Sequence, residues 1–154
     1  MLDALNIVLG EGKLENADIC VHADNGESLL IECAFEDLPE TLTLDATSTT
    51  TLADEYLVDR EGRLRLSWTW LIKRDTNGPV FGKSLIQAIA WAPQGSGLGD
   101  LHEKKNTDLK RLVREAGIEE SCDLNNNASM RQALWAKARD DGRLSLAETA
   151  IDLA

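Results

Sequence analysis

The chain has 154 residues, of which 43% are hydrophobic and 28% are charged, and its formal net charge at pH 7 is −11. These proportions are close to the average of soluble globular domains, and the length suffices for one domain whose core needs no disulfide or metal. No apolar run approaches the roughly 20 residues of a membrane-spanning helix, and the N-terminus lacks the pattern of a secretory signal. We therefore expect a cytoplasmic protein with no membrane partner.

The negative charge is concentrated in the first part of the chain. Residues 1–59 hold 14 Asp and Glu residues and one basic residue, Lys13, and so carry −13. Residues 60–154 hold 13 acidic and 15 basic residues and so carry +2. Two interpretations remain open: the acidic strands pair with the basic stretch at 63–74, or they form an acidic face for a basic partner.

The first predicted strands form a hairpin. Residues 17–23 and 29–35 flank Asp24-Asn25-Gly26-Glu27, a sequence that is typical of a hairpin turn. With a three-residue loop at 25–27, the apolar residues of both strands lie on one face and Cys20 points to the other. We expect Cys20, Cys33 and Cys122 to be three reduced thiols.

Further strands are predicted up to residue 91. Short Gly, Asn and Asp turns at 60–62 and 75–78 separate them, which is typical of an antiparallel meander or a small barrel. Whether residues 5–9 add a strand or a short helix stays open. The predicted strands are 41–51, 52–58 as its continuation, 63–73 and 79–91.

The C-terminal part is predicted to be helical. A Gly-rich junction, residues 93–100, ends the last strand. Within 101–116, apolar residues recur at the spacing of one buried helix face, and Gly117 then ends the helix. Capping-box patterns predict helices that start near Ser129 and Ser145. For 133–139 alternation also allows a strand, and helix is favoured.

Together these patterns predict one α+β domain over residues 1–154. An antiparallel β meander or small OB-like barrel occupies about residues 5–92, and a helical part docks on it from residue 101.

The sequence holds no motif for catalysis or for a metal. Residues 140–148 resemble the second half of an EF-hand loop, but Lys137 and Arg139 occupy positions that need oxygen ligands. GSGLG at 95–99 lacks the spacing of a phosphate-binding loop, and His22 and His102 lie in different elements. We expect a non-enzymatic protein without a cofactor or metal.

The stretch RLRLSWTWLIKR at 63–74 combines cations with two tryptophans. Alternation along a strand places Trp68 and Trp70 on one face and Arg63, Arg65 and Lys73 on the other. Because stacking of bases with phosphate contacts needs both kinds of residue on one surface, the tryptophans are predicted to belong to the core.

A strand meander, the turn at Gly78 before Phe81-Gly82-Lys83, and the helix TDLKRLVREAGI at 107–118 resemble phage-encoded single-stranded DNA-binding proteins with an OB-like fold. The resemblance covers roughly residues 40–140 and implies binding of single strands without strong sequence preference and without a cofactor. The contacts that it implies are Arg63, Arg65, Lys73, Arg74, Lys83, Lys104, Lys105, Lys110, Arg111 and Arg114.

Two departures from that family leave a second hypothesis open, behind that of single-stranded DNA binding. The tryptophans lie on the wrong face, and the first 59 residues would repel phosphates. The alternative is a protein–protein interaction module or inhibitor that presents an acidic, nucleic-acid-mimicking N-terminal face to a basic partner. The oligomeric state is not indicated by either hypothesis.

Overall fold

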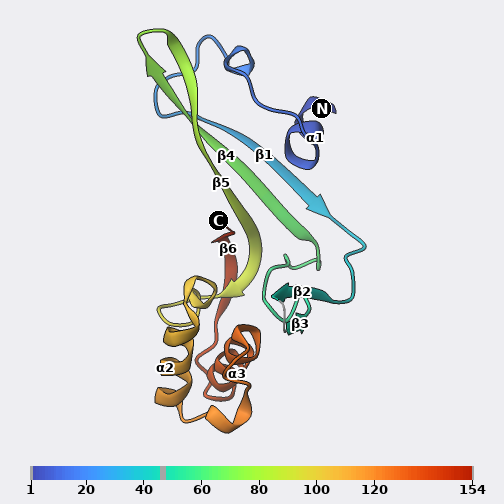
Figure 1. Ribbon diagram of the computed structural model, residues 1–154, viewed down its shortest axis with the longest axis vertical. Helices are drawn as coiled ribbons and strands as arrows, with labels where there is room; N and C mark the ends of the chain where they lie inside the picture. Colours follow the sequence, from blue (N-terminus) through green and yellow to red (C-terminus); the bar gives the residue numbers. More distant parts are fainter. Residues whose placement is uncertain (1, 46–47, 154) are drawn as a thin grey trace. The chain divides into compact units, whose positions relative to one another are not determined.

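A computed structural model describes residues 2–45 and 48–153, and it has an α+β fold (Figure 1). Four strands form an antiparallel sheet in the order β1-β4-β5-β6, and β2 pairs separately with β3. The sheet is open, so the antiparallel sheet of the prediction is present and its alternative, a closed barrel, is not. The elements are α1 (Leu2–Leu9), the 3-10 turn η1 (Asn16–Asp18), β1 (Ser28–Phe35), β2 (Leu42–Asp45), β3 (Ser48–Thr50), β4 (Leu64–Asp75), β5 (Gly78–Pro93), the turn η2 (Leu101–Glu103), α2 (Asn106–Ala116), the turn η3 (Glu119–Ser121), α3 (Asn127–Asp140) and β6 (Leu146–Asp152).

The described residues divide into two compact units. One comprises 2–34, 66–87 and 152–153, and the other 35–45, 48–65 and 88–151. The long strands β4 and β5 contribute residues to both units. The expectation of a single domain stays a prediction, because it concerns whether either unit folds without the other.

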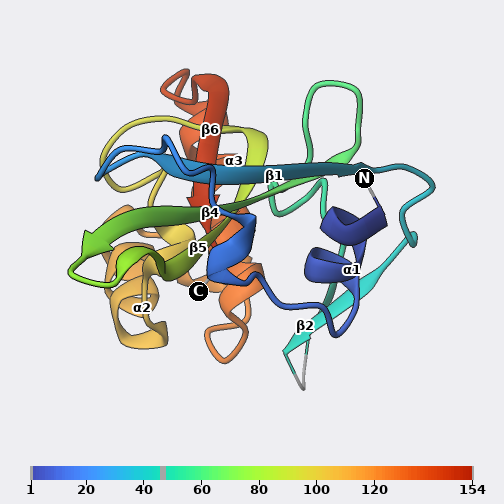
Figure 2. The same ribbon diagram turned by 90° about the horizontal axis from the view of Figure 1, so that it is seen from above.

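The first unit is built on the hairpin of β4 and β5, with β1 along the outer side of β4 (Figure 2). The predicted turn at 75–78 joins the hairpin strands. Its Asp75 carboxylate accepts a hydrogen bond from the amide of Asn77 at 2.7 Å, and Gly78 has φ 117°. Only glycine adopts that φ without strain, which is why the turn falls here.

The predicted hairpin of residues 17–23 with 29–35 is wrong. The chain around Gly26 pairs with β4 instead: the Gly26 amide donates to the carbonyl of Ile72 at 3.0 Å, and the Ile72 amide donates to the carbonyl of Glu27 at 2.7 Å. Gly26 and Glu27 thus both lie opposite Ile72, an arrangement known as a β-bulge. Gly26 has φ 94° there. The alternation in 29–35 identified a strand with one buried face, but it carried no information about the partner strand.

Residues 17–23 form turns that cover the hairpin rather than a strand. Ile19 and Ala23 are buried against Ile72 of β4, and Phe81 of β5 packs beside them. The apolar residues that suggested a strand are therefore buried by packing on a face of the sheet. Residues 5–9, which the sequence left open, belong to helix α1.

The predicted strand at 41–51 is divided. Strands β2 and β3 pair with each other, and residues 46–47 between them lie outside the described residues. The predicted continuation at 52–58 is wrong, because this segment is a series of turns. The Glu55 amide donates to the carbonyl of Thr51 at 3.2 Å, and the Leu57 amide donates to that of Leu52 at 2.9 Å.

The second unit has its core between α2 and α3, which lie side by side (Figure 1). Leu109 and Val113 of α2 are fully buried, and so are Met130 and nearly all of Trp135 on α3. The predicted helix face within 101–116 is confirmed. Gly117 ends α2 at φ 65°, as predicted for a left-handed C-terminal residue.

Helix α3 begins at Asn127, slightly before the predicted start at Ser129. The side chain of Asn126 accepts the amide of Ser129 at 3.0 Å, so Asn126 caps the helix in place of the serine. The Ser129 hydroxyl instead accepts the amide of Asp123 at 3.0 Å. Helix is thereby confirmed for residues 133–139.

The predicted helix from Ser145 is wrong, because the segment forms strand β6. In the second unit the amide of Gln94 donates to the carbonyl of Ser145 at 2.9 Å. In the first, the amide of Leu153 donates to the carbonyl of Ile86 at 3.1 Å. The long strand β5 offers an edge for pairing, and the β-branched Thr149 and Ile151 suit a strand, so pairing overrides the capping-box pattern.

Trp68 is buried, as predicted, whereas Trp70 is half-buried. All three cysteines are free thiols, as predicted, and Cys20 is exposed. Within the described residues no helix is both long enough and apolar enough to cross a membrane.

Candidate functional site

Five of the ten predicted DNA-contacting cations are held in ion pairs with carboxylates of the same chain. Arg63 contacts both Asp59 and Glu61, at 2.8 and 3.2 Å. In each such pair the carboxylate neutralises positive charge that would be needed to bind a phosphate backbone. The other pairs are Arg65–Glu148 at 2.9 Å, Lys104–Asp100 at 2.5 Å, Arg111–Glu115 at 2.8 Å and Arg114–Glu119 at 3.3 Å.

The Arg63 pair is part of the turn before β4. The carboxylate of Asp59 is buried and accepts hydrogen bonds from the Arg63 amide and Nε, both at 2.9 Å, and from the Glu61 amide. Burial raises the pKa of Asp59, but the hydrogen bonds from Arg63 and Glu61 outweigh it, so the pKa lies below its ordinary value. Arg63 therefore holds a turn together.

The remaining predicted cations are divided between the two units. Arg74 donates to the backbone carbonyls of Ala23 at 2.6 and 2.9 Å and of Val21 at 3.1 Å, and so fixes the turns of residues 17–23. Lys73 and Lys83 are exposed in the first unit, whereas Lys105 is exposed and Lys110 half-buried in the second. The assignment of all ten residues to DNA contacts stays a prediction.

The N-terminal carboxylates behave differently from the cations. Residues 11–27, here called the acidic segment, expose five carboxylates, and within the described residues none of the five forms an ion pair. Lys13 is the one basic residue among positions 1–59. The five carboxylates are those of Glu11, Glu15, Asp18, Asp24 and Glu27.

Two of these carboxylates also shape the segment. The Asp18 carboxylate accepts the amide of Glu15 at 2.8 Å, and the Glu27 carboxylate accepts the amide of Asp24 at 3.1 Å. Such short-range bonds fix the turns that carry the charges. The carboxylates of Glu11 and Asp24 make no bond of this kind, and both reach solvent.

A buried ionic network lies in the second unit. Glu55 is fully buried, and its Oε2 accepts a hydrogen bond from Nε of Arg131 at 2.8 Å and forms an ion pair with Nη2 at 2.7 Å. Its Oε1 accepts the hydroxyl of Thr50 at 3.2 Å. His102 Nε2 donates to the carbonyl oxygen of Glu55 at 2.8 Å, because a carbonyl can only accept. Every bond of this network is internal, which indicates a structural role.

The residue after Glu55 has a strained backbone. Tyr56 has φ 52°, a left-handed conformation that is costly for an aromatic residue. Its ring meets the indole of Trp135 edge-on, at 5.0 Å between centroids, and its hydroxyl accepts Nη2 of Arg139 at 2.8 Å. Burial of Glu55 and these contacts hold Tyr56 in place.

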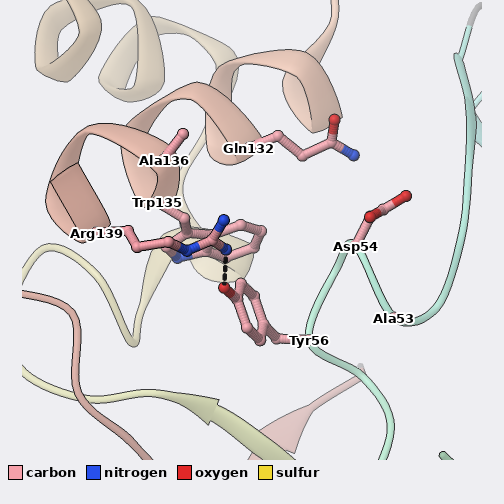
Figure 3. A pocket seen from close by; sticks show the side chains of 7 residues that line it. All are labelled: Ala53, Asp54, Tyr56, Gln132, Trp135, Ala136 and Arg139. Carbon is pink, nitrogen blue, oxygen red and sulfur yellow. Dashed lines mark hydrogen bonds between the residues drawn. The ribbon is translucent and has the colours of Figure 1, made fainter.

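A polar hollow of about 310 Å³ lies on one side of Tyr56, between the 53–56 turn and α3. Figure 3 shows Arg139 bonded to Tyr56 on one side, and the amide of Gln132 and the carboxylate of Asp54 on the other. The Gln132 amide donates to the hydroxyl of Thr50 at 3.0 Å. These polar groups are mostly engaged with the protein itself.

Tyr56 also lines an aromatic hollow of about 450 Å³. Its walls include the rings of Tyr56 and Trp91 and the apolar Val58 and Leu146. The guanidinium carbon of Arg60 lies 3.6 Å above the centroid of the Trp91 ring, a cation–π contact. Sequence reasoning missed Tyr56, Arg60 and Trp91, since a turn residue and two aromatics far apart in the chain form no motif.

Among the residues that the structure describes, no group of three His, Cys, Asp or Glu side chains is placed to hold a metal ion. No family model matches the chain, and no curated protein or solved structure shows significant similarity to it. The resemblance to single-stranded DNA-binding proteins therefore stays a prediction.

Proposed function

We propose that the protein is a non-catalytic binding protein and that its acidic segment contacts a basic protein partner. The observation that supports this is the contrast between the two kinds of charge. The five carboxylates of residues 11–27 are exposed and form no ion pair with any residue that the structure describes, whereas five of the ten cations of the competing hypothesis are in ion pairs.

Exposed apolar side chains accompany the carboxylates. Val21, which lies between Asp18 and Asp24 in the chain, is 77% exposed, and Leu5 and Leu9 of α1 are 42% and 59% exposed. Protein interfaces combine an apolar centre with a polar rim, and a few apolar anchors contribute most of the affinity. The acidic segment and helix α1 together thus supply both parts of such an interface, and the charges of the acidic segment steer a basic partner toward it.

Charge reversal at Glu11 and Asp24 tests the proposal, because these two carboxylates support no turn. The probe is a fluorescent peptide of about 20 residues that alternates Lys and Leu, titrated by anisotropy at two salt concentrations. Glu11→Lys/Asp24→Lys is expected to weaken binding roughly tenfold at low salt, since each reversal removes an attraction and adds a repulsion.

Glu103→Lys/Glu120→Lys is the matched control. Both residues are exposed in the second unit, neither forms an ion pair among the described residues, and the change in net charge is identical. This variant is expected to bind the peptide like the native protein. Equal weakening by both variants would mean that net charge alone attracts the probe, and the proposal would then be wrong.

Labelled oligo-dT in the same titration addresses the competing hypothesis. On our proposal the native protein shows no saturable binding to it at low salt. Binding that weakens steeply with salt and is lost in Lys105→Glu/Lys110→Glu would favour single-stranded DNA instead. Those two lysines are suitable because neither is in an ion pair within the described chain.

A further inference from the structure

We propose that the aromatic hollow beside Tyr56 binds a small planar aromatic anion, with Arg60 as its anchor. This site lies in the second unit and is independent of the acidic segment. It rests on three observations: a guanidinium held on an indole ring, the absence of a carboxylate partner for it, and an adjacent apolar space.

Arg60 is positioned by the ring beneath it. Its guanidinium carbon is 3.6 Å from the centroid of Trp91, although the side chain is exposed. A guanidinium that stacks on an aromatic face keeps its N–H groups in its own plane, directed outward. The contact therefore limits the freedom of a long side chain before any ligand arrives, and this reduces the entropic cost of binding.

Arg60 has no carboxylate partner among the described residues, even though acidic residues flank it. Asp59 accepts three hydrogen bonds from Arg63 and Glu61, and the Glu61 carboxylate accepts Nη2 of Arg63 at 3.2 Å. Both neighbouring carboxylates thus bond to Arg63 and not to Arg60. The N–H donors of Arg60 stay available for an anion, and planar oxyanions match their fork.

The space next to Arg60 is formed before binding. The Trp91 amide donates to the carbonyl of Val58 at 2.8 Å, which fixes the two facing walls by a backbone bond. Tyr56 is held by Trp135 and Arg139, as described above. The aromatic hollow has a volume of about 450 Å³, which suits a ligand of small-molecule size. Its walls are largely aromatic or aliphatic, apart from Arg60 and the buried Asp59, whose carboxylate is paired with Arg63.

These features together select the chemistry of the ligand. A planar ring fills the space between Tyr56, Val58 and Leu146, and an oxyanion at one end accepts hydrogen bonds from Arg60. Aromatic carboxylates and nucleoside monophosphates share this chemistry. The two sources differ in ring size and in the charge of the anion, so separate probes distinguish them.

Isothermal titration calorimetry with naphthalene-2-carboxylate tests the proposal, with thymidine monophosphate as the second probe. Naphthalene-2-methanol is the neutral analogue of the first. We expect saturable binding of at least one anion with a Kd between about 10 µM and about 1 mM, in the range for a ligand of this size with one charged contact. The neutral analogue is expected to bind at least tenfold more weakly.

Variants of Arg60 separate the anchor from general charge. Arg60→Gln is expected to weaken anion binding at least tenfold, and Arg60→Lys to weaken it less, because lysine keeps the charge but loses the planar fork. Arg111→Gln, which alters an exposed arginine on α2, removes the same charge and is expected to leave binding unchanged. Since Arg60 is exposed and supports no other residue through an ion pair, its variants are expected to fold.

Three results would overturn the proposal. The first is no saturable binding of either anion up to about 10 mM, well above the expected range. The second is equal binding of the neutral analogue, and the third is unchanged binding by Arg60→Gln. Binding of only one of the two anions supports the proposal and identifies the source of the ligand.

Discussion

The guanidinium of Arg131 donates a hydrogen bond from Nε to a carboxylate oxygen of Glu55 at 2.8 Å, and its Nη2 forms an ion pair with the same oxygen at 2.7 Å. Glu55 is fully buried and Arg131 is 8% exposed. Both residues belong to the second unit, although they are 76 residues apart in the chain. The pair ties the 51–58 turns to α3, and Tyr56 in these turns lines both hollows. The position of the candidate ligand site therefore depends on this buried pair.

Removal of one partner of this pair is expected to destabilise the protein strongly. Arg131→Met leaves the Glu55 carboxylate buried without its cation, and such a change costs ~3–5 kcal/mol in the free energy of unfolding. Urea denaturation followed by tryptophan fluorescence measures this loss. For a chain of this length it corresponds to a decrease in Tm of roughly 10 °C.

The double variant Glu55→Leu/Arg131→Met is the control for that experiment. It removes both charges and fills the space with apolar groups, so it is expected to be more stable than Arg131→Met alone. If the double variant loses as much stability as the two single variants added together, the pair is not coupled as the structure indicates.

Protonation of His102 is expected to make stability depend on pH. Burial lowers the pKa of His102, and the charge of Arg131 lowers it further, although the carbonyl and the carboxylate of Glu55 oppose this. In the unfolded chain His102 has its ordinary pKa of about 6.5, so just below that pH the unfolded chain binds more protons than the folded one. The contribution of His102 is complete above about pH 6.5 and decreases as the pH falls toward the folded pKa.

Urea denaturation at about pH 7.5 and about pH 5.5 measures this effect. The native protein is expected to be less stable at the lower pH, whereas His102→Gln, whose amide can still donate to the Glu55 carbonyl, shows a smaller difference. The other histidine, His22, is exposed and serves for comparison as His22→Gln. An identical pH dependence in the native protein and His102→Gln would contradict the assignment.

Gly117→Ala is expected to destabilise the protein by ~1 kcal/mol. Gly117 has φ 65° at the end of α2, and no heavy atom lies within 4 Å of a Cβ added there. The cost is therefore conformational and not steric crowding by neighbours. Gly117→Asn, which tolerates the left-handed region better, is expected to lose less stability. If alanine and asparagine were equivalent in thermal unfolding, helix termination at Gly117 would need another explanation.

Two of the three thiols, those of Cys20 and Cys122, are expected to react at different rates. Cys20 is exposed, whereas Cys122 is half-buried, and burial together with the charges of Asp123 and Glu119 raises the pKa of its thiol. Because the thiolate is the reactive form, Cys20 is expected to be alkylated roughly tenfold faster than Cys122. Pulsed labelling with iodoacetamide and peptide mass spectrometry measures both rates. Faster labelling of Cys122 would show that its surroundings open in solution.

Local patterns in the sequence were sufficient for several elements. The spacing of Leu109, Leu112 and Val113 determined α2 and its buried face, because a helix repeats every 3.6 residues whatever lies beside it. Gly78 and Gly117 determined a hairpin turn and a helix end, since only glycine adopts these backbone angles without strain. The alternation in residues 63–74 likewise determined β4 and the burial of Trp68.

The tertiary structure decided which strands pair and which charges meet. Alternation in 29–35 and a capping pattern at 145–148 are local, but β1 pairs with β4 and β6 with β5, so the partner is fixed by backbone bonds between distant residues. The same holds for Glu55 with Arg131 and for Arg60 with Trp91. Charge composition, a property of the sequence alone, identified an acidic N-terminal region. Only the folded structure showed that, within the described residues, the carboxylates at 11–27 form no ion pair, whereas many of the cations do. Ion pairing depends on distances between side chains, and the order of residues does not contain these distances.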